Sequence, residues 1–130
     1  MTVFAVAAGA ARLATGISFL VVPEMAHRMW GGSADSGPTV APLLRSMGYR
    51  DALIGGLLLQ AGLRHRPTAG WFLAFGGADA ADVVGGLANL DHLSEQQRRR
   101  GLGGAAVGLG VGLIGAIAAA RSNRKVNSKI

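Results

Sequence analysis

Residues 101–120 read GLGGAAVGLGVGLIGAIAAA, a run without one charged side chain. An α-helix rises 1.5 Å per residue, so about 20 apolar residues are needed to cross the ~30 Å hydrocarbon core of a bilayer. A run of this length and composition therefore predicts a transmembrane helix.

Three further apolar segments precede this run, at residues 3–22, 42–63 and 69–90. Pro23 and Glu24 close the first, and the short basic turn at 64–67 separates the second from the third. We therefore expect a single all-α domain over residues 1–130, an integral membrane bundle of four transmembrane helices. Residues 24–38 and 91–100 would be loops, with Trp30 at the membrane interface, and residues 121–130 a basic, disordered tail.

The composition favours a membrane protein. Half of the residues are hydrophobic and only 15% are charged, whereas soluble domains carry about 25% charged residues. Cysteine is absent, which excludes disulfides and cysteine-based metal sites. The net charge of +6 arises from basic clusters that follow the apolar segments, without a basic helix face or interleaved aromatic residues. We therefore expect contact with lipid headgroups and no nucleic-acid partner.

Two alternatives concern the first and second segments. Segment 3–22 could be a signal peptide, but such peptides carry their positive charge before the apolar core, whereas Arg12 lies inside it. Segment 42–63 is interrupted by Arg45, Arg50 and Asp51, which leaves a soluble helical bundle as an alternative. In the membrane interpretation, placing both termini in the cytoplasm puts six basic residues inside and four outside, so the positive-inside rule favours that orientation.

Six charged side chains fall inside the first three apolar segments, three cationic and three anionic: Arg12, Arg45, Arg50, Asp51, Asp79 and Asp82. Most of them lie near the middle of their segments and so near one plane of the bilayer. A charge at that depth is costly unless an opposite charge accompanies it. We therefore expect Arg12 or Arg50 to pair with at least one of the three carboxylates and to hold the first three helices together.

These charges have a structural and a functional interpretation. In the structural one, buried salt bridges fix the order and register of the helices. In the functional one, they line a polar cavity in which Asp51, Asp79 and Asp82 are candidate acid/base groups. Arg12 or Arg50 would then stabilise negative charge that develops on a substrate.

Glycine spacing predicts close helix contacts. Gly104, Gly108 and Gly112 repeat every four residues and would allow contact within the chain, with a second copy or with another membrane protein. On segment 42–63, one face is smooth apart from a single carboxylate, and it consists of Gly48, Asp51, Gly55 and Gly62.

Residues 110–115 spell the glycine pattern of dinucleotide-binding loops, GVGLIG. That pattern functions between a strand and a helix, with an acidic residue about 20 positions later. Here it lies within an apolar segment and no acidic residue follows, so we predict no nucleotide site and no cofactor. His27, His65 and His92 fall at segment ends without metal-ligand spacing, so we predict no metal site.

The string Arg45-x-x-Gly48-x-Arg50-Asp51, followed by an apolar run and then by Asp79-x-x-Asp82, resembles a group of uncharacterised small four-helix bacterial membrane proteins. The resemblance covers most of the chain. It implies the four-helix topology and brings no established activity.

Three classes of function remain open, so the sequence does not decide whether the protein is an enzyme. The first is an accessory or structural subunit of a membrane assembly, which we favour at this point. The second is a membrane-embedded enzyme that isomerises, cyclises or opens an epoxide in a lipophilic substrate. The third is a transporter of protons or small solutes. Fully paired charges without a cavity would favour the first class, and a pocket beside the carboxylates the second.

Overall fold

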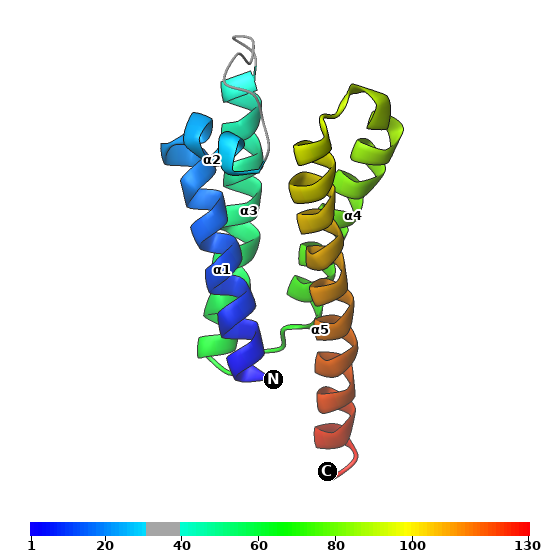
Figure 1. Ribbon diagram of the computed structural model, residues 1–130. Helices are drawn as coiled ribbons and strands as arrows, with labels where there is room; N and C mark the ends of the chain where they lie inside the picture. The colour runs from blue at the N-terminus through cyan, green and yellow to red at the C-terminus, as the bar shows by residue number, and fades with distance from the viewer. Residues whose placement is uncertain (31–39) are drawn as a thin grey trace.

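The computed structural model describes residues 1–30 and 40–130, and all regular secondary structure in these ranges is helical (Figure 1). The expected all-α class is therefore confirmed. The four long helices are α1 (Thr2–Val21), α3 (Val40–Leu63), α4 (Ala69–Ala88) and α5 (Gly103–Asn127). The shorter elements are α2 (Pro23–Met29), the 3₁₀ turn η1 (Leu90–His92) and the π-helical stretch η2 (Gln97–Leu102).

Two connecting segments are more helical than expected. The first part of the loop expected at 24–38 lies in α2, which begins at Pro23, because proline at the first helical position lacks only an N–H that would have no partner there. Residues 31–38 of that expected loop lie outside the described ranges. The loop expected at 91–100 contains η1 and the start of η2, which runs directly into α5 as one helix, Gln97–Asn127.

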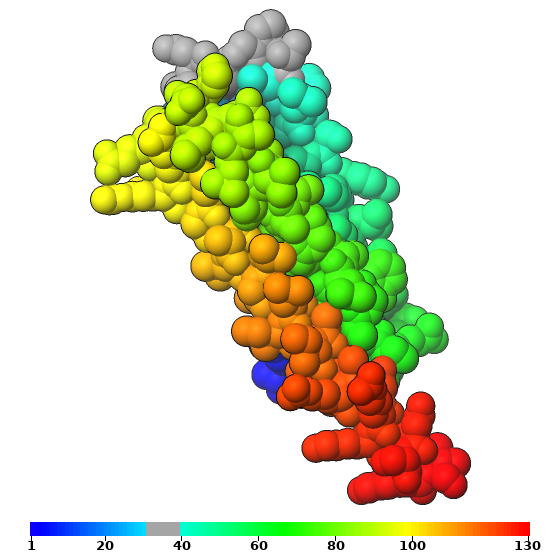
Figure 2. Space-filling view, turned by 90° about the vertical axis from the view of Figure 1, so that its right-hand side faces the viewer, coloured from blue at the N-terminus to red at the C-terminus, as the bar shows by residue number. Residues whose placement is uncertain are grey.

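The basic tail is also helical, which corrects the expected disorder after Arg121. α5 continues to Asn127, and Arg124 and Lys125 occupy its last turn. Both residue types have high helix propensity, and their positive charges interact favourably with the carbonyl end of the helix dipole. Figure 2 shows the result, an elongated molecule in which the C-terminal part of α5 extends beyond the other helices.

The four long helices form two tightly packed pairs, α1 with α3 and α4 with α5 (Figure 1). In the first pair the two backbones approach so closely that only glycine fits. A Cβ atom on Gly55 would lie 2.8 Å from the carbonyl oxygen of Gly9, and one on Gly16 would lie 2.6 Å from that of Gly48. These crossings confirm that the glycine face predicted on residues 48–62 contacts another helix.

The second pair uses glycine in the same way. A Cβ atom on Gly76 of α4 would lie 3.2 Å from the Cα atom of Gly112 on α5. Gly115 makes room for the ring of Phe72, which is fully buried and stacks on Phe4 of α1 at a centroid distance of 5.5 Å. A small apolar core to which all four long helices contribute joins the pairs, and it consists of Ala5, Leu58, Phe72, Phe75 and Ala116.

The outer surface carries many large apolar side chains. They are found on all four long helices and include Val3, Ile17, Leu43, Leu53, Leu73, Val84, Val107, Leu113 and Ile117. By length and composition, two helices are able to cross a membrane, α1 and the continuous helix Gln97–Asn127.

The glycine crossings predict a matched pair of substitutions. Gly16→Ala places a methyl group against the backbone of α3, so we expect a loss of about 1–3 kcal/mol in unfolding free energy. Gly77→Ala places the same group in open space on α4 and should be neutral or stabilising by up to about 1 kcal/mol. Thermal unfolding of the detergent-solubilised variants measures both effects. Equal melting temperatures for the two variants would contradict this packing.

Candidate functional site

A series of five alternating charges links three helices, and we call it the charge ladder. Its order is Asp79–Arg12–Asp51–Arg50–Asp82. Arg12 on α1 reaches Asp79 Oδ2 through Nη1 at 2.6 Å and Asp51 Oδ1 through Nη2 at 3.0 Å. Arg50 on α3 donates from Nε to Asp51 at 3.1 Å and from Nη2 to Asp82 Oδ2 at 2.9 Å. The expected pairing of Arg12 or Arg50 with a carboxylate is confirmed.

Arg12 is the centre of this ladder, and only 7% of the residue is exposed. Its guanidinium bridges α3 and α4 through Asp51 and Asp79, and its Cζ atom lies 4.2 Å from the centroid of the Phe75 ring. The ring face adds a cation–π attraction that grows as water is excluded. Among the residues that the structure describes, Nε of Arg12 has no hydrogen-bond partner. The buried cation is therefore held by two carboxylates and one aromatic face.

The glycine contacts explain why Arg12 meets Asp51. Arg12 lies between Gly9 and Gly16 on α1, and Asp51 lies between Gly48 and Gly55 on α3. Because these glycines form the two close crossings of the helices, the residues between them are brought to the same interface. The Arg12–Asp51 ion pair is thus enclosed between two backbone contacts.

The position of the Asp79 carboxylate depends on a glycine of α5, Gly108. The carboxylate of Asp79 occupies the space that a Cβ atom on Gly108 would take. Gly104 likewise faces the ring of Trp30, and Gly112 faces the backbone of Gly76. All three glycines of the repeating pattern are therefore in contact within the chain. Contact with a second copy or another membrane protein through them stays a prediction.

The ladder differs from the expected balance of three cations and three anions. Arg45 is exposed on α3, and the ion pairs found among the described residues do not include it. Arg50 points about 100° away from the glycine face, yet its long side chain spans the distance to Asp51 and to Asp82 on α4. The ladder therefore holds two guanidinium groups and three carboxylates, an excess of one negative charge.

A cavity of about 740 Å³ lies between the two helix pairs, and we call it the inter-pair cleft. Four ladder residues line it: Arg12, Asp51, Asp79 and Asp82. Its other walls are mostly apolar and include many small residues, among them Ala7, Ala8, Ala11, Gly101, Gly104 and Ala105. The Asp51 and Asp79 side chains are 12% exposed and that of Asp82 is 36% exposed, so Asp82 is the most accessible carboxylate of the ladder.

Sequence reasoning missed Phe75 and the glycines of α1 and α4. A signal for the glycines of α1 exists, because Gly9-x-x-Arg12-x-x-x-Gly16 has the same spacing as Gly48-x-x-Asp51-x-x-x-Gly55 on α3. Two helices with the same spacing of glycines around opposite charges can pack against each other so that the glycines meet and the charges pair. No comparable pattern identifies Phe75, because apolar and aromatic residues are common throughout its helix.

Fold and site define a small helical protein with buried ion pairs between its helices and two helices long and apolar enough to cross a membrane. The chain belongs to the family described as a domain of unknown function, DUF4267, whose model matches residues 9–123. This match covers the whole ladder and agrees with the resemblance to an uncharacterised family. No curated protein and no solved structure matches the sequence.

The ladder predicts an asymmetric double-mutant cycle. Arg12→Gln leaves Asp79 buried without its cation, so we expect a loss of about 3–5 kcal/mol in unfolding free energy. Asp79→Asn should cost less, because the four remaining ladder charges then balance. The double variant should recover part of the Arg12→Gln loss, with a coupling energy of about 1–3 kcal/mol in detergent-solubilised protein. A coupling energy near zero would mean that the two charges are solvated separately.

Proposed function

We propose that all four long helices span the bilayer, so that the protein is a multi-pass membrane protein. α3 and α4 have 24 and 20 residues, which correspond to about 36 and 30 Å of helix. Asp51 and Asp79, which lower the hydropathy of these helices, are buried in the ladder. The exposed residues of α3 and α4 include Leu53 and Leu73, whose apolar side chains suit a lipid environment.

We further propose that the inter-pair cleft binds a lipophilic molecule with a polar head. The observation that carries this proposal is the lining, in which ladder charges form one polar patch within otherwise apolar walls. Ligand sites commonly combine apolar walls with a few polar groups that fix the orientation of the ligand. Because the ladder has one excess negative charge, the head would donate hydrogen bonds or carry a positive charge.

Acid/base chemistry on such a ligand is the reaction that this site supports best. Asp82 would exchange a proton with the ligand, since it is the most accessible ladder carboxylate and lines the cleft. Arg12 and Asp51 would hold the ligand's polar group. Isomerisation, cyclisation and epoxide opening can each proceed by such a proton transfer.

The accessory role remains a second candidate, and a separate observation favours it. The small residues of α1 and α5 along the cleft would let the backbone of a partner helix approach closely. A transmembrane helix from another protein could then replace the small ligand in the cleft.

The orientation gives one prediction. Both termini should lie in the cytoplasm, because the loops on that side carry the larger number of arginine and lysine residues. Since the chain has no cysteine, Thr2→Cys and Ser128→Cys each introduce a single thiol. A membrane-impermeant maleimide should label neither thiol in intact cells and both after permeabilisation. Labelling of either thiol in intact cells would contradict the proposed orientation.

Photolabelling tests the binding proposal. Alkyl diazirine reagents bearing an amine, a hydroxyl or no head group would be added to the protein in nanodiscs, and labelled peptides identified by mass spectrometry. We expect the amine reagent to label the cleft segments of α1 and α5 preferentially. Ala11→Phe fills the cleft and should reduce this labelling strongly, as should Asp82→Asn for the amine reagent alone.

The matched control is Leu113→Phe, which enlarges an exposed residue of α5 outside the cleft lining and should leave the labelling unchanged. Equal labelling of all lipid-facing helix positions by all three reagents would contradict a binding site. Loss of labelling when a transmembrane partner copurifies would instead favour the accessory role.

A further inference from the structure

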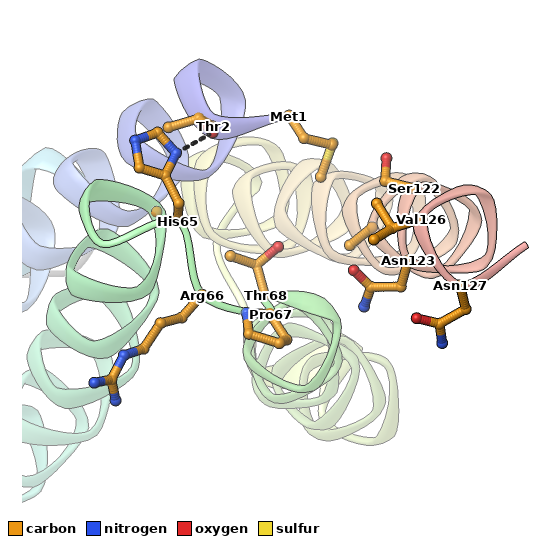
Figure 3. Close-up of a pocket in the computed structure, with 12 residues that line it drawn as sticks. Met1, Thr2, His65, Arg66, Pro67, Thr68, Ser122, Asn123, Val126 and Asn127 are labelled. Atoms are coloured by element: carbon orange, nitrogen blue, oxygen red, sulfur yellow. Dashed lines mark hydrogen bonds between the residues drawn. The ribbon is translucent and has the colours of Figure 1, made fainter. Parts of the chain in front are cut away.

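A second cavity, of about 490 Å³, lies at the end of the bundle where the α3–α4 turn meets α1 and α5. We call it the end pocket. Its polar lining comes from the turn and from the last turns of α5, and it includes His65, Thr68, Ser122, Asn123 and Asn127. Figure 3 shows the Asn123 side chain extending from α5 toward Thr68, across the space between the two elements.

Backbone hydrogen bonds at the end of α3 fix the α3–α4 turn, which carries His65 and Thr68. α3 ends in a Schellman motif, with Arg66 N–H donating to Ala61 O at 2.9 Å and His65 N–H to Gly62 O at 3.2 Å. His65 occupies the left-handed position of this motif with φ 53°, where glycine is the usual residue. Its side chain borders the end pocket, and Nδ1 lies 3.4 Å from the Thr2 hydroxyl (Figure 3).

Thr68, a largely buried residue, lines the same pocket. The residue is the N-cap of α4 and is 9% exposed, yet its side chain makes no capping hydrogen bond. A threonine at this position usually caps the helix with its side-chain oxygen. Its hydroxyl is therefore not used to cap the helix and remains a donor or acceptor in the pocket that Asn123 also lines.

The surroundings of the end pocket are strongly basic. Six exposed cationic residues lie on the turn and on the end of α5: Arg64, Arg66, Arg121, Arg124, Lys125 and Lys129. The carboxylates of the described residues lie elsewhere, either in the ladder or on α2 and the α4–α5 connection. A phosphate would thus meet neutral hydrogen-bond donors and Arg66 in the pocket lining and a positive potential around it, without a side-chain carboxylate to repel it.

We propose that the end pocket binds a phosphate group, and that the phosphate belongs to the headgroup of an anionic phospholipid. The choice of a lipid rests on the proposed membrane placement, which puts this end of the bundle at the headgroup layer. The hydroxyl of Thr68 and the amide of Asn123 contact the phosphate, and the surrounding arginine and lysine residues add a long-range attraction to its negative charge. Ala119, which also lines the pocket and lies one turn closer to the bilayer than Asn123, contacts the apolar part of the lipid.

Native mass spectrometry of the full chain in detergent tests this site with three additives: phosphatidylglycerol, phosphatidylcholine and inorganic phosphate. We expect one phosphatidylglycerol molecule to be retained in preference to phosphatidylcholine. Asn123→Leu removes a lining donor from an exposed position without changing the net charge, and it should weaken retention about tenfold. Thr68→Val should act in the same direction.

The matched control removes charge at the opposite end of the bundle. Arg98→Gln combined with Arg99→Gln should leave retention within about twofold, because neither residue lines the end pocket. Binding of inorganic phosphate that is lost in Asn123→Leu would keep the phosphate site and assign it to a soluble ligand. Unchanged retention in folded Asn123→Leu and Thr68→Val would overturn the proposal, since binding would then come from the basic surface alone. Each outcome is independent of photolabelling in the inter-pair cleft.

Discussion

The structure depends on the neutralisation of one buried cation, the guanidinium of Arg12. An isolated charge at the middle of a bilayer costs several kcal/mol, so a helix that carries one needs partners at the same depth. Asp51 on α3 and Asp79 on α4 supply them at 3.0 and 2.6 Å. The same contacts fix which helices are neighbours and at what height, because a shift of one turn would separate the charges by ~5.4 Å.

Glycine makes this neutralisation possible. A glycine stands three residues before a ladder charge on each of three helices, at Gly9, Gly48 and Gly76. The first two let the α1 and α3 backbones meet on either side of the Arg12–Asp51 pair, and the third brings α4 against α5 beside Asp79. The backbone contact brings the charges within reach, and the ion pairs in turn connect the tightly packed pairs to each other. Between the pairs the packing is looser, and there the cleft forms.

Much of this could be predicted from the sequence, because a buried charge in an apolar helix has few favourable arrangements. Helical segments and the pairing of Arg12 with a carboxylate follow from segment length and from the cost of burying charge. The absence of Arg45 from the ladder could not be predicted. A long side chain near a helix end can turn either inward or outward, and the sequence does not decide between the two. The helical tail after Arg121 reflects local helix propensity, which the polar, basic composition of the tail obscured. The cation–π contact of Phe75 depends on tertiary surroundings that no local pattern records. The inter-pair cleft likewise results from how the two pairs diverge.

The charge ladder, with three carboxylates and two guanidinium groups, has two effects. It fixes the relative positions of three helices, and it leaves a negative patch in the cleft. The claim on which both depend is that Arg12 touches Asp51 and Asp79 in a lipid bilayer. Rotational-echo solid-state NMR on protein labelled with ¹⁵N at the arginine guanidinium and ¹³C at the aspartate carboxyl measures this directly. We predict strong dephasing of the Asp51, Asp79 and Asp82 carboxyl signals, loss of the Asp79 effect in Arg12→Gln, and weak dephasing of Asp91. An Asp79 signal that is not dephased in the unsubstituted protein would contradict the account.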